Sequence, residues 1–296
     1  MIPVSIPHAD CLYIGYNFNS MNKFISVIIP TFNRRDFLGG AIDSVLKQTH
    51  AHFEIIVVDD GSDDGTDDLL AGYGDRIRVI RQEKQGASAA RNSGIKAARY
   101  DLLAFLDSDD RFVETKLGIQ YKAMQENPEF VVSHTDEVWY RRGRLLNQKS
   151  KHARTGGMLY DRSLVMCVVG MSTVMARKQL FDAVGLFDES LPCCEDYDLW
   201  LRTAIRFPFL KIDAPLTIKN GGRPDQLSHQ HRVGMDKFRI RSIHKILAEE
   251  KLTAEQRRKA GEELAKKCRI YGRGCLKHGR RNEGMQYLAA AEEIDT

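Results

Sequence analysis

The chain has 296 residues, a formal net charge of +4, 43% hydrophobic residues and 28% charged residues. This composition is ordinary for a globular protein, and the length suffices for one large α/β domain, with or without a small appendage. No apolar run reaches the roughly 18 residues that span a bilayer, so we expect no transmembrane helix. The N-terminus lacks the basic start and apolar core of a secretory signal, so we expect a cytoplasmic protein.

From residue 24 onward, short apolar runs alternate with amphipathic stretches. We predict buried strands over residues 24–30, 53–62, 76–82 and 101–110. We predict helices between them, over residues 36–48, from Thr66 onward, and over residues 87–98. Four strand–helix units in succession imply right-handed crossovers and a mainly parallel sheet flanked by helices.

Polar side chains gather at the predicted C-terminal ends of three of these strands. They are Thr31, Asn33, Asp59, Asp60, Asp107 and Asp109. In open α/β sheets, ligands bind at the edge where the carboxyl ends of the strands meet. We therefore expect a ligand site that is rich in carboxylates at this edge.

The rest of the chain is expected to be less regular. We predict a helix over residues 116–127, a hairpin that starts with residues 131–140, and a helix over 196–206. Beyond residue 222 the composition turns helical and basic, and the last stretch resembles a helix–turn–helix of the tetratricopeptide kind.

The basic residues of this C-terminal region are strongly clustered. Residues 235–281 contain fifteen Lys or Arg against six Asp or Glu. The excess is either a solvated helical surface or a patch that faces anionic lipid headgroups or an anionic acceptor. We expect no nucleic-acid partner, because aromatic residues are sparse there and no binding motif is present.

Two acidic motifs follow apolar runs. In FLDSDD, Asp107 and Asp109 stand two residues apart, so on a strand they would project to the same side. Two carboxylates in this arrangement suit Mg²⁺ or Mn²⁺ shared with phosphate oxygens, although acidic turns are also common. In VVDDGS, the carboxylates of Asp59 and Asp60 suit the imide N–H of uracil or a ribose hydroxyl, or else form an ordinary turn.

Five segments in order, SVIIPTFNR, VVDDGSDDGT, QGASAARNSG, FLDSDD and CCEDYDLW, resemble a family 2 glycosyltransferase of the GT-A fold. The resemblance covers about residues 24–205. It implies an inverting enzyme that uses a divalent cation, Mn²⁺ or Mg²⁺, and a nucleotide-sugar donor, with a UDP-sugar expected. The Rossmann, Walker and nucleotidylyltransferase glycine motifs are absent.

The resemblance also implies roles for single residues. Pro30, Thr31, Asn33 and Asp60 would line the pocket for the base and ribose, Asp59 would support its wall, and Gln85 and Arg91 would contact the nucleotide. Asp107 and Ser108 would belong to the nucleotide-sugar site, and Asp109 would be the principal metal ligand, assisted by Asp107. An exposed helix arginine remains an alternative interpretation of Arg91.

The motif Glu195–Asp196 would supply the catalytic carboxylates. In the family, the aspartate of this pair is the general base for the acceptor hydroxyl, and Glu195 is its neighbour; the alternative is a simple acidic helix start. His229 would be a third metal contact, although a surface histidine fits equally well. Trp200 would stack on a sugar ring or, more in keeping with a helix tryptophan, belong to the core.

These expectations give a division of the chain and a function. We predict an N-terminal extension over residues 1–22, a GT-A domain over 23–222 and a basic helical region over 223–296. Within the GT-A domain, residues 23–114 would bind the nucleotide-sugar and 115–222 the acceptor side. The expected acceptor is a glycan or a lipid-linked glycan in cell-surface polysaccharide synthesis, with peripheral contact to the inner membrane surface. The alternatives are an inactive nucleotide-sugar-binding protein and an adaptor that acts through its basic tail.

Overall fold

The structure is a computed structural model, and it describes residues 23–141, 143–146, 153–223, 226–231, 233–249 and 251–295. The extension predicted over residues 1–22 lies outside the described residues. Among the described residues, no helix is long and apolar enough to cross a membrane.

The first half of the chain builds four parallel strands in the order β3-β2-β1-β4. The strands are β1 (Ile25–Thr31), β2 (Phe53–Asp59), β3 (Arg78–Arg81) and β4 (Leu102–Phe105). The helices between them are α1 (Arg35–Leu46), α2 (Thr66–Ala71) and α3 (Ala87–Ala97), with a short 3₁₀ turn at Gly74–Arg76. The four predicted strand–helix units are therefore confirmed.

Strand β4 is shorter than predicted. It ends at Phe105, and the chain then turns, with the amide of Asp110 donating to the carbonyl of Asp107 at 2.9 Å. Asp107 and Asp109 thus lie in a turn. The prediction that they occupy alternate positions of a strand is wrong.

The second half of the chain extends the sheet with mixed strand directions. It contributes β5 (Arg111–Phe112), β6 (Val132–Arg141), β7 (Arg144–Leu146), β8 (Val174–Arg177) and β9 (Leu210–Gly221). Strand β8 pairs antiparallel with both β4 and β6, whereas β9 runs parallel to β6. The sheet is therefore parallel from β3 to β4 and mixed beyond β4, and the predicted α/β fold with flanking helices is confirmed. The predicted hairpin is confirmed, since β6 pairs antiparallel with β7.

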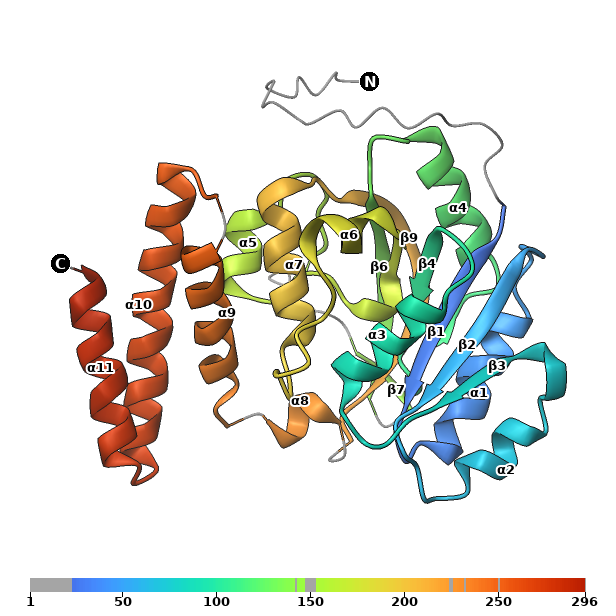
Figure 1. The fold of residues 1–296 in the computed structure, drawn as a ribbon, viewed down its shortest axis with the longest axis horizontal. Helices are drawn as coiled ribbons and strands as arrows, with labels where there is room; N and C mark the ends of the chain where they lie inside the picture. The colour runs from blue at the N-terminus through green and yellow to red at the C-terminus, as the bar shows by residue number, and fades with distance from the viewer. Residues whose placement is uncertain are drawn as a thin grey trace.

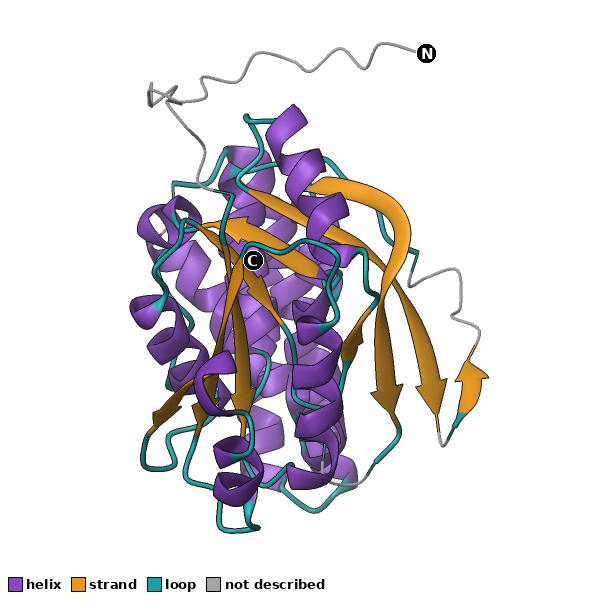
Figure 2. Ribbon diagram, turned by 90° about the vertical axis from the view of Figure 1, so that its right-hand side faces the viewer, coloured by secondary structure: helices purple, strands orange, loops and turns teal. Residues whose placement is uncertain are grey.

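Helices cover both faces of the sheet (Figures 1 and 2). Those of the second half are α4 (Lys116–Glu126), α5 (Tyr160–Val165), α6 (Gln179–Val184) and α7 (Glu195–Arg206), with a 3₁₀ turn at Met171–Thr173. Alternate residues of β1 serve the two faces: Val27 and Ile29 pack with α1 and α4, and Ile28 packs in the cluster that holds α3 and α7.

Helix α3 lies very close to β1. A Cβ atom on Gly94 would come within 2.4 Å of Ile28 Cγ2, so no larger residue fits there without a shift. This close approach fixes the position of Arg91, three residues earlier on the same helix.

The C-terminal helices extend the core. They are α8 (Leu227–Gln230), α9 (Met235–Glu249), α10 (Ala254–Lys277) and α11 (Arg281–Asp295). Helix α10 starts with a capping box between Thr253 and Gln256. Buried side chains of α9 and α10, such as Ile243 and Leu264, belong to the same apolar cluster as Ile28. Helix α9 lies between α7 and α10, and α11 packs on α10 (Figure 1).

Candidate functional site

A cavity of about 570 Å³ opens where β1, β2 and β4 end. Segments distant in the sequence line it: the loops after these strands, the start of α3, β9, the start of α7, and residues of α8 and α9. The predicted site residues that line it are Pro30, Thr31, Asp60, Arg91, Asp107, Ser108, Asp109, Glu195 and Asp196. Asn33, Asp59, Gln85 and His229 are not among its lining residues.

Asp60 organises the wall at the nucleotide end of the cavity. Its Oδ1 accepts hydrogen bonds from the Gln82 side chain (2.7 Å) and the Gln85 amide (2.9 Å), and its Oδ2 accepts one from the Gly86 amide (2.7 Å). Gly86 has φ +96°, a conformation that favours glycine. Asp60 therefore holds the loop that leads into α3.

Asn33 and Asp59 stabilise the turns next to this wall. Asn33 and Asp63 exchange hydrogen bonds at 2.8 and 2.9 Å, and Asp59 Oδ1 accepts from the amide and hydroxyl of Ser62. The turns after β1 and β2 are thereby locked together. The Gln85 side chain turns to the Glu83 carbonyl at 3.3 Å, so Gln85 contributes to the wall through its backbone.

A cation also lies at this end of the cavity. The ammonium of Lys84 sits 3.9 Å from the centroid of the Phe32 ring, and both residues line the cavity. This pair was not predicted from the sequence, although a lysine directly before the Gln-Gly motif could have indicated it.

Arg91 joins the two ends of the cavity. Its guanidinium contacts Asp107 Oδ1 at 2.9 Å and Glu195 Oε1 at 2.7 Å, and its side chain is only 7% exposed. The alternative interpretation of Arg91 as an exposed helix residue is therefore wrong. Burial opposes ionisation of Asp107, but Arg91 and Lys219 hold the pKa of this carboxyl below its ordinary value. Burial raises the pKa of Glu195, and the neighbouring Asp196 adds to that rise while Arg91 opposes it.

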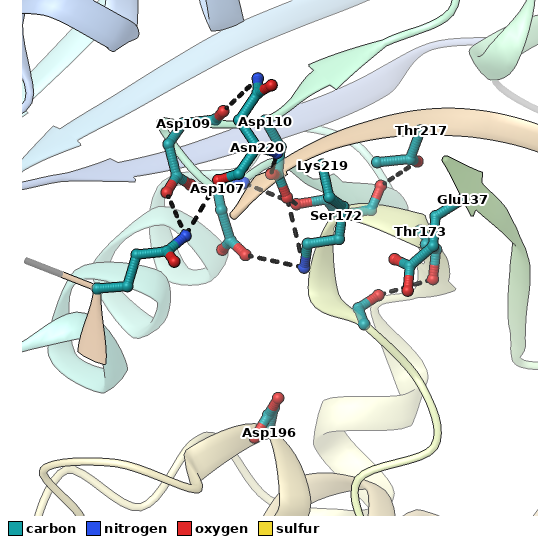
Figure 3. A network of polar contacts seen from close by, with 12 residues as sticks. Asp107, Asp109, Asp110, Glu137, Ser172, Thr173, Asp196, Thr217, Lys219 and Asn220 are labelled. Carbon is teal, nitrogen blue, oxygen red and sulfur yellow. Dashed lines mark hydrogen bonds and ion pairs between the residues drawn. The ribbon is translucent and has the colours of Figure 1, made fainter. Parts of the chain in front are cut away.

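The turn after β4 carries three carboxylates that are held by cations from β9 and the segment after it (Figure 3). Asp109 forms an ion pair with Arg223 and accepts from Gln226 at 3.2 Å. Lys219 lies 3.9 Å from Asp107 and 3.4 Å from Asp110.

Asp110 is the most buried acid of this turn. Ser172 donates to its Oδ2 at 2.7 Å and the Asn220 amide to its Oδ1 at 3.3 Å. Burial, with the charges of Asp107 and Asp109, raises the pKa of Asp110 to about 7. Asp110 also lines the cavity, and its hydrogen bond from the Asn220 amide anchors the turn to β9.

The carboxylates of this turn are ligands of the type that magnesium and manganese ions take. Asp107 and Asp109 both line the cavity, and carboxylate oxygens are the hard ligands that these ions take together with phosphate oxygens and water. Within the described residues, no group of three or more His, Cys, Asp or Glu side chains is arranged to hold a metal. His229 is exposed on α8, away from the lining of the cavity, and its metal role stays a prediction.

Asp196 faces these carboxylates from the opposite side of the cavity (Figure 3). It lies in the first turn of α7, where its Oδ1 accepts from the Tyr197 amide at 2.7 Å. Its Oδ2 accepts from the Cys167 thiol at 3.2 Å. Burial and the charge of Asp196 raise the pKa of Cys167 well above its ordinary value, so this thiol keeps its proton. Cys167 was not predicted as a site residue.

Asp198 and Trp200 of α7 are structural. Asp198 is buried and pairs with Arg202 at 2.8 Å. Trp200 is 1% exposed and packs edge-to-face on Phe209, which confirms the core interpretation.

Helix α9 also contributes to the cavity, which the sequence analysis did not foresee. Met235 and Arg239 line it on the side of Asp196. Asp236 holds the Arg239 guanidinium at 3.1 Å, and this guanidinium lies 5.7 Å from the ring centroid of Tyr197.

The fold matches that of GT-A glycosyltransferases. The residues 1–349 of Staphylococcus aureus TarS, solved in complex with UDP-GlcNAc, superpose with a TM-score of 0.63 at 19% identity, covering 91% of this chain and 90% of that one. Mannosyltransferase PcManGT from Pyrobaculum calidifontis, in complex with GDP-Man and Mn²⁺, superposes with a TM-score of 0.61 at 15% identity, covering 91% and 75%.

The sequence comparison then gives the family. The model of "Glycosyl transferase family 2" matches residues 26–182, and the chain belongs to this family. An uncharacterized glycosyltransferase of Rickettsia felis is 39% identical over 201 residues, which cover 65% of this chain and 32% of that protein's length.

Two relatives carry more specific descriptions. The putative teichuronic acid biosynthesis glycosyltransferase TuaG of Bacillus subtilis is 37% identical over 52% of this chain and 62% of its own length. An Escherichia coli protein, described as UDP-Glc:alpha-D-GlcNAc-diphosphoundecaprenol beta-1,3-glucosyltransferase WfgD, is 33% identical over 60% of this chain and 68% of its own length.

Proposed function

We propose that the protein is an inverting, divalent-cation-dependent glycosyltransferase that moves a sugar from a UDP-sugar to an acceptor hydroxyl. The observation that carries this proposal is the position of Asp196, which faces Asp107 and Asp109 across one cavity. A proton acceptor and a pair of metal-binding carboxylates on opposite sides of one space are what an in-line displacement at an anomeric carbon needs.

The chemistry assigns a task to each side of the cavity. Asp196 takes the proton of the acceptor hydroxyl while that oxygen forms a bond to the anomeric carbon. The bond from the anomeric carbon to the diphosphate breaks on the opposite face, so the configuration inverts and the nucleoside diphosphate leaves. Asp109 and Asp107 would hold a divalent cation, which would supply positive charge to neutralise the departing diphosphate.

Neighbouring residues hold the carboxylates of the cavity in place. Asp60 offers its carboxylate to the base and ribose end while it fixes the loop before α3. Arg91 holds Asp107 and Glu195 in one rigid array, so the donor side and the acceptor side keep a constant separation. The Cys167 thiol and the Tyr197 amide orient the Asp196 carboxylate.

We propose residues 23–114 as the nucleotide-sugar side and residues 115–222 as the acceptor side, to which residues 223–296 add Gln226, Met235 and Arg239. For the acceptor we propose a lipid-linked glycan in cell-surface polysaccharide synthesis. The names of the Bacillus subtilis and Escherichia coli relatives support this choice. Such an acceptor suits a protein that contacts an anionic membrane with its basic C-terminal helices.

An inactive binding protein or an adaptor is a weaker proposal. A protein that had lost catalysis would not need to retain both Asp109 and Asp196, and both line the cavity here.

Calorimetric titration of UDP, GDP and dTDP, each with Mn²⁺ and with EDTA, tests the donor site. We expect tight binding of UDP only with Mn²⁺. In Asp109→Ala, this metal-dependent binding is expected to weaken by about tenfold or more, because a principal ligand of the cation is lost. The matched control is Asp75→Ala, an exposed acid in the turn before β3. If well-folded protein binds no nucleotide with metal present, the proposal is wrong.

A further inference from the structure

The charges of helix α10 are distributed unevenly along its length. In its first half, Arg258 pairs with Glu255 and Glu262, and Lys259 pairs with Asp161. From residue 264 to residue 282, the sequence holds seven Lys or Arg and no Asp or Glu. The positive charge therefore concentrates at the end of α10 and the start of α11.

Several of these cations point outward. Arg273, Lys277 and Arg281 are exposed, and none of the three forms an ion pair with any residue that the structure describes. Lys267 differs, since it is buried and donates to the Val165 carbonyl at 3.0 Å.

Large apolar side chains of the same two helix segments are exposed as well. Ile270 is 52% exposed, Leu276 38% and Met285 55%. The two helices meet closely here, because Gly284 approaches the Leu276 side chain and Gly272 approaches the Gly284 carbonyl. We call this surface the α10–α11 tip: Ile270, Arg273, Leu276, Lys277, Arg281 and Met285.

The tip lies at the end of the molecule where the catalytic cavity opens. The turn between α10 and α11 is at the same end as α8 and the C-terminal ends of β1 and β2 (Figure 1). Helix α9, which packs on α10, carries Met235 and Arg239 into the cavity. The apolar core is continuous between these helices and the sheet, so a surface that holds the tip also fixes the position of the cavity.

We propose that the α10–α11 tip docks the protein on an anionic lipid surface. Its cations attract acidic headgroups, and its three exposed aliphatic side chains enter the interface between headgroups and acyl chains. A nucleic acid fits less well, because the tip has no exposed aromatic ring on which a base would stack. The inference rests on the proposed function in one respect: the proposed lipid-linked acceptor is the reason why the cavity should face the lipid surface.

Sedimentation with sucrose-loaded vesicles tests the tip. The full chain is incubated with phosphatidylcholine vesicles, with or without about one third phosphatidylglycerol, at low and at high salt. We expect binding only to the anionic vesicles, at least about tenfold weaker at high salt. The triple variant Arg273→Gln/Lys277→Gln/Arg281→Gln should lose about tenfold or more of this binding, and Ile270→Ser/Met285→Ser should weaken it at both salt concentrations.

The matched control is Lys47→Gln/Lys96→Gln/Lys122→Gln, which removes three exposed charges from α3, from α4 and from the residue that follows α1. It should bind vesicles like the wild type. Equal loss in both triple variants, no binding by the wild type, or a preference for an RNA oligonucleotide over the vesicles would overturn the proposal. Titration of UDP with Mn²⁺ separates the docking proposal from the proposed function, because the tip variants should bind nucleotide normally. If the wild type binds vesicles but no nucleotide, the docking proposal holds and the proposed transferase function is wrong.

Discussion

Arg91 shows how single residues set the geometry of the cavity. It is buried between Asp107 and Glu195, which stand 16 and 104 residues away in the sequence. A buried guanidinium with two carboxylate partners is costly to leave half-paired, so the three groups hold one another in place. Glu195 thereby fixes the start of α7 and the adjacent Asp196.

Asp196→Asn tests the assignment of the general base. The amide has nearly the same shape but cannot take a proton, so transfer should fall by about 10²-fold or more while UDP binding stays near the wild-type value. Sugar transfer is measured with a screened acceptor, and nucleotide binding by calorimetry. Asp182→Asn, an exposed acid on α6, is the control. Transfer at the normal rate by Asp196→Asn would mean that another group accepts the proton.

The residues of the site could be predicted from the sequence only in part. The motifs that carry the family resemblance predict Asp60, Asp109 and Asp196, and all three line the cavity. Lys219 and Arg223 lie more than a hundred residues from the acids that they neutralise, with Arg223 separated from Asp109 by 114 positions. No local pattern signals such pairs, because only the folded sheet brings β9 beside the turn after β4.

At the scale of whole elements, local sequence patterns predict the first half of the sheet but, in the second half, only the hairpin of β6 and β7. The apolar runs of β1, β2 and β4 are complete enough to identify buried strands. Strand β9 alternates weakly, and its parallel pairing with β6 shifts register near Asp136. Its place is decided by long-range pairing, which a single sequence does not contain.

Helix α9 forms part of the cavity, and Arg239→Gln tests its contribution. Arg239 lines the cavity on the side that we propose for the acceptor, so the variant should raise the KM for acceptor by about tenfold and leave UDP affinity unchanged. Arg241→Gln is the control, since its guanidinium lies on the same helix but contacts Ser190 at the surface. Equal effects of the two variants, or a loss of UDP affinity in Arg239→Gln alone, would contradict this role.

Strand β6 makes the stability of the fold dependent on pH. His134 is buried on this strand, and burial lowers its pKa to about 4, below the ordinary value of about 6.5. Arg154 and Lys211 lower it further, whereas Asp136 opposes them. The unfolded chain therefore binds a proton that the folded chain does not, and the free energy of unfolding should fall as the pH drops from about 6.5 towards 4, by at most about 1.4 kcal/mol per pH unit.

Urea unfolding at about pH 7 and about pH 5 measures this dependence. His134→Gln should show a smaller fall than the wild type over this interval. The exposed His52→Gln should keep the wild-type slope. A wild-type slope in His134→Gln would assign the pH dependence to the carboxylates.

For the whole molecule, the apolar core decides whether the helical region is a separate domain. One cluster contains Ile28 of the sheet, Trp200 of α7, Ile243 of α9 and Ala291 of α11. Removal of residues 235–296 would leave an apolar face of α7 in water. We propose that residues 23–222 and the helices after them unfold as one cooperative unit.

Ile243→Ala tests this cooperativity. Ile243 is fully buried, so the loss of its side chain should lower the free energy of unfolding by about 2–5 kcal/mol. Both tryptophans lie before residue 222, so their fluorescence reports on the sheet and α7, whereas far-ultraviolet circular dichroism also reports on α9–α11. We expect both signals to shift together to lower urea, while Ile119→Ala, at an exposed position of α4, leaves them in place. If the helical region unfolds independently, the dichroism transition of Ile243→Ala should move to lower urea while its fluorescence transition stays in place. The reason is that a cavity in one part of a protein lowers the stability of another part only when the two unfold together.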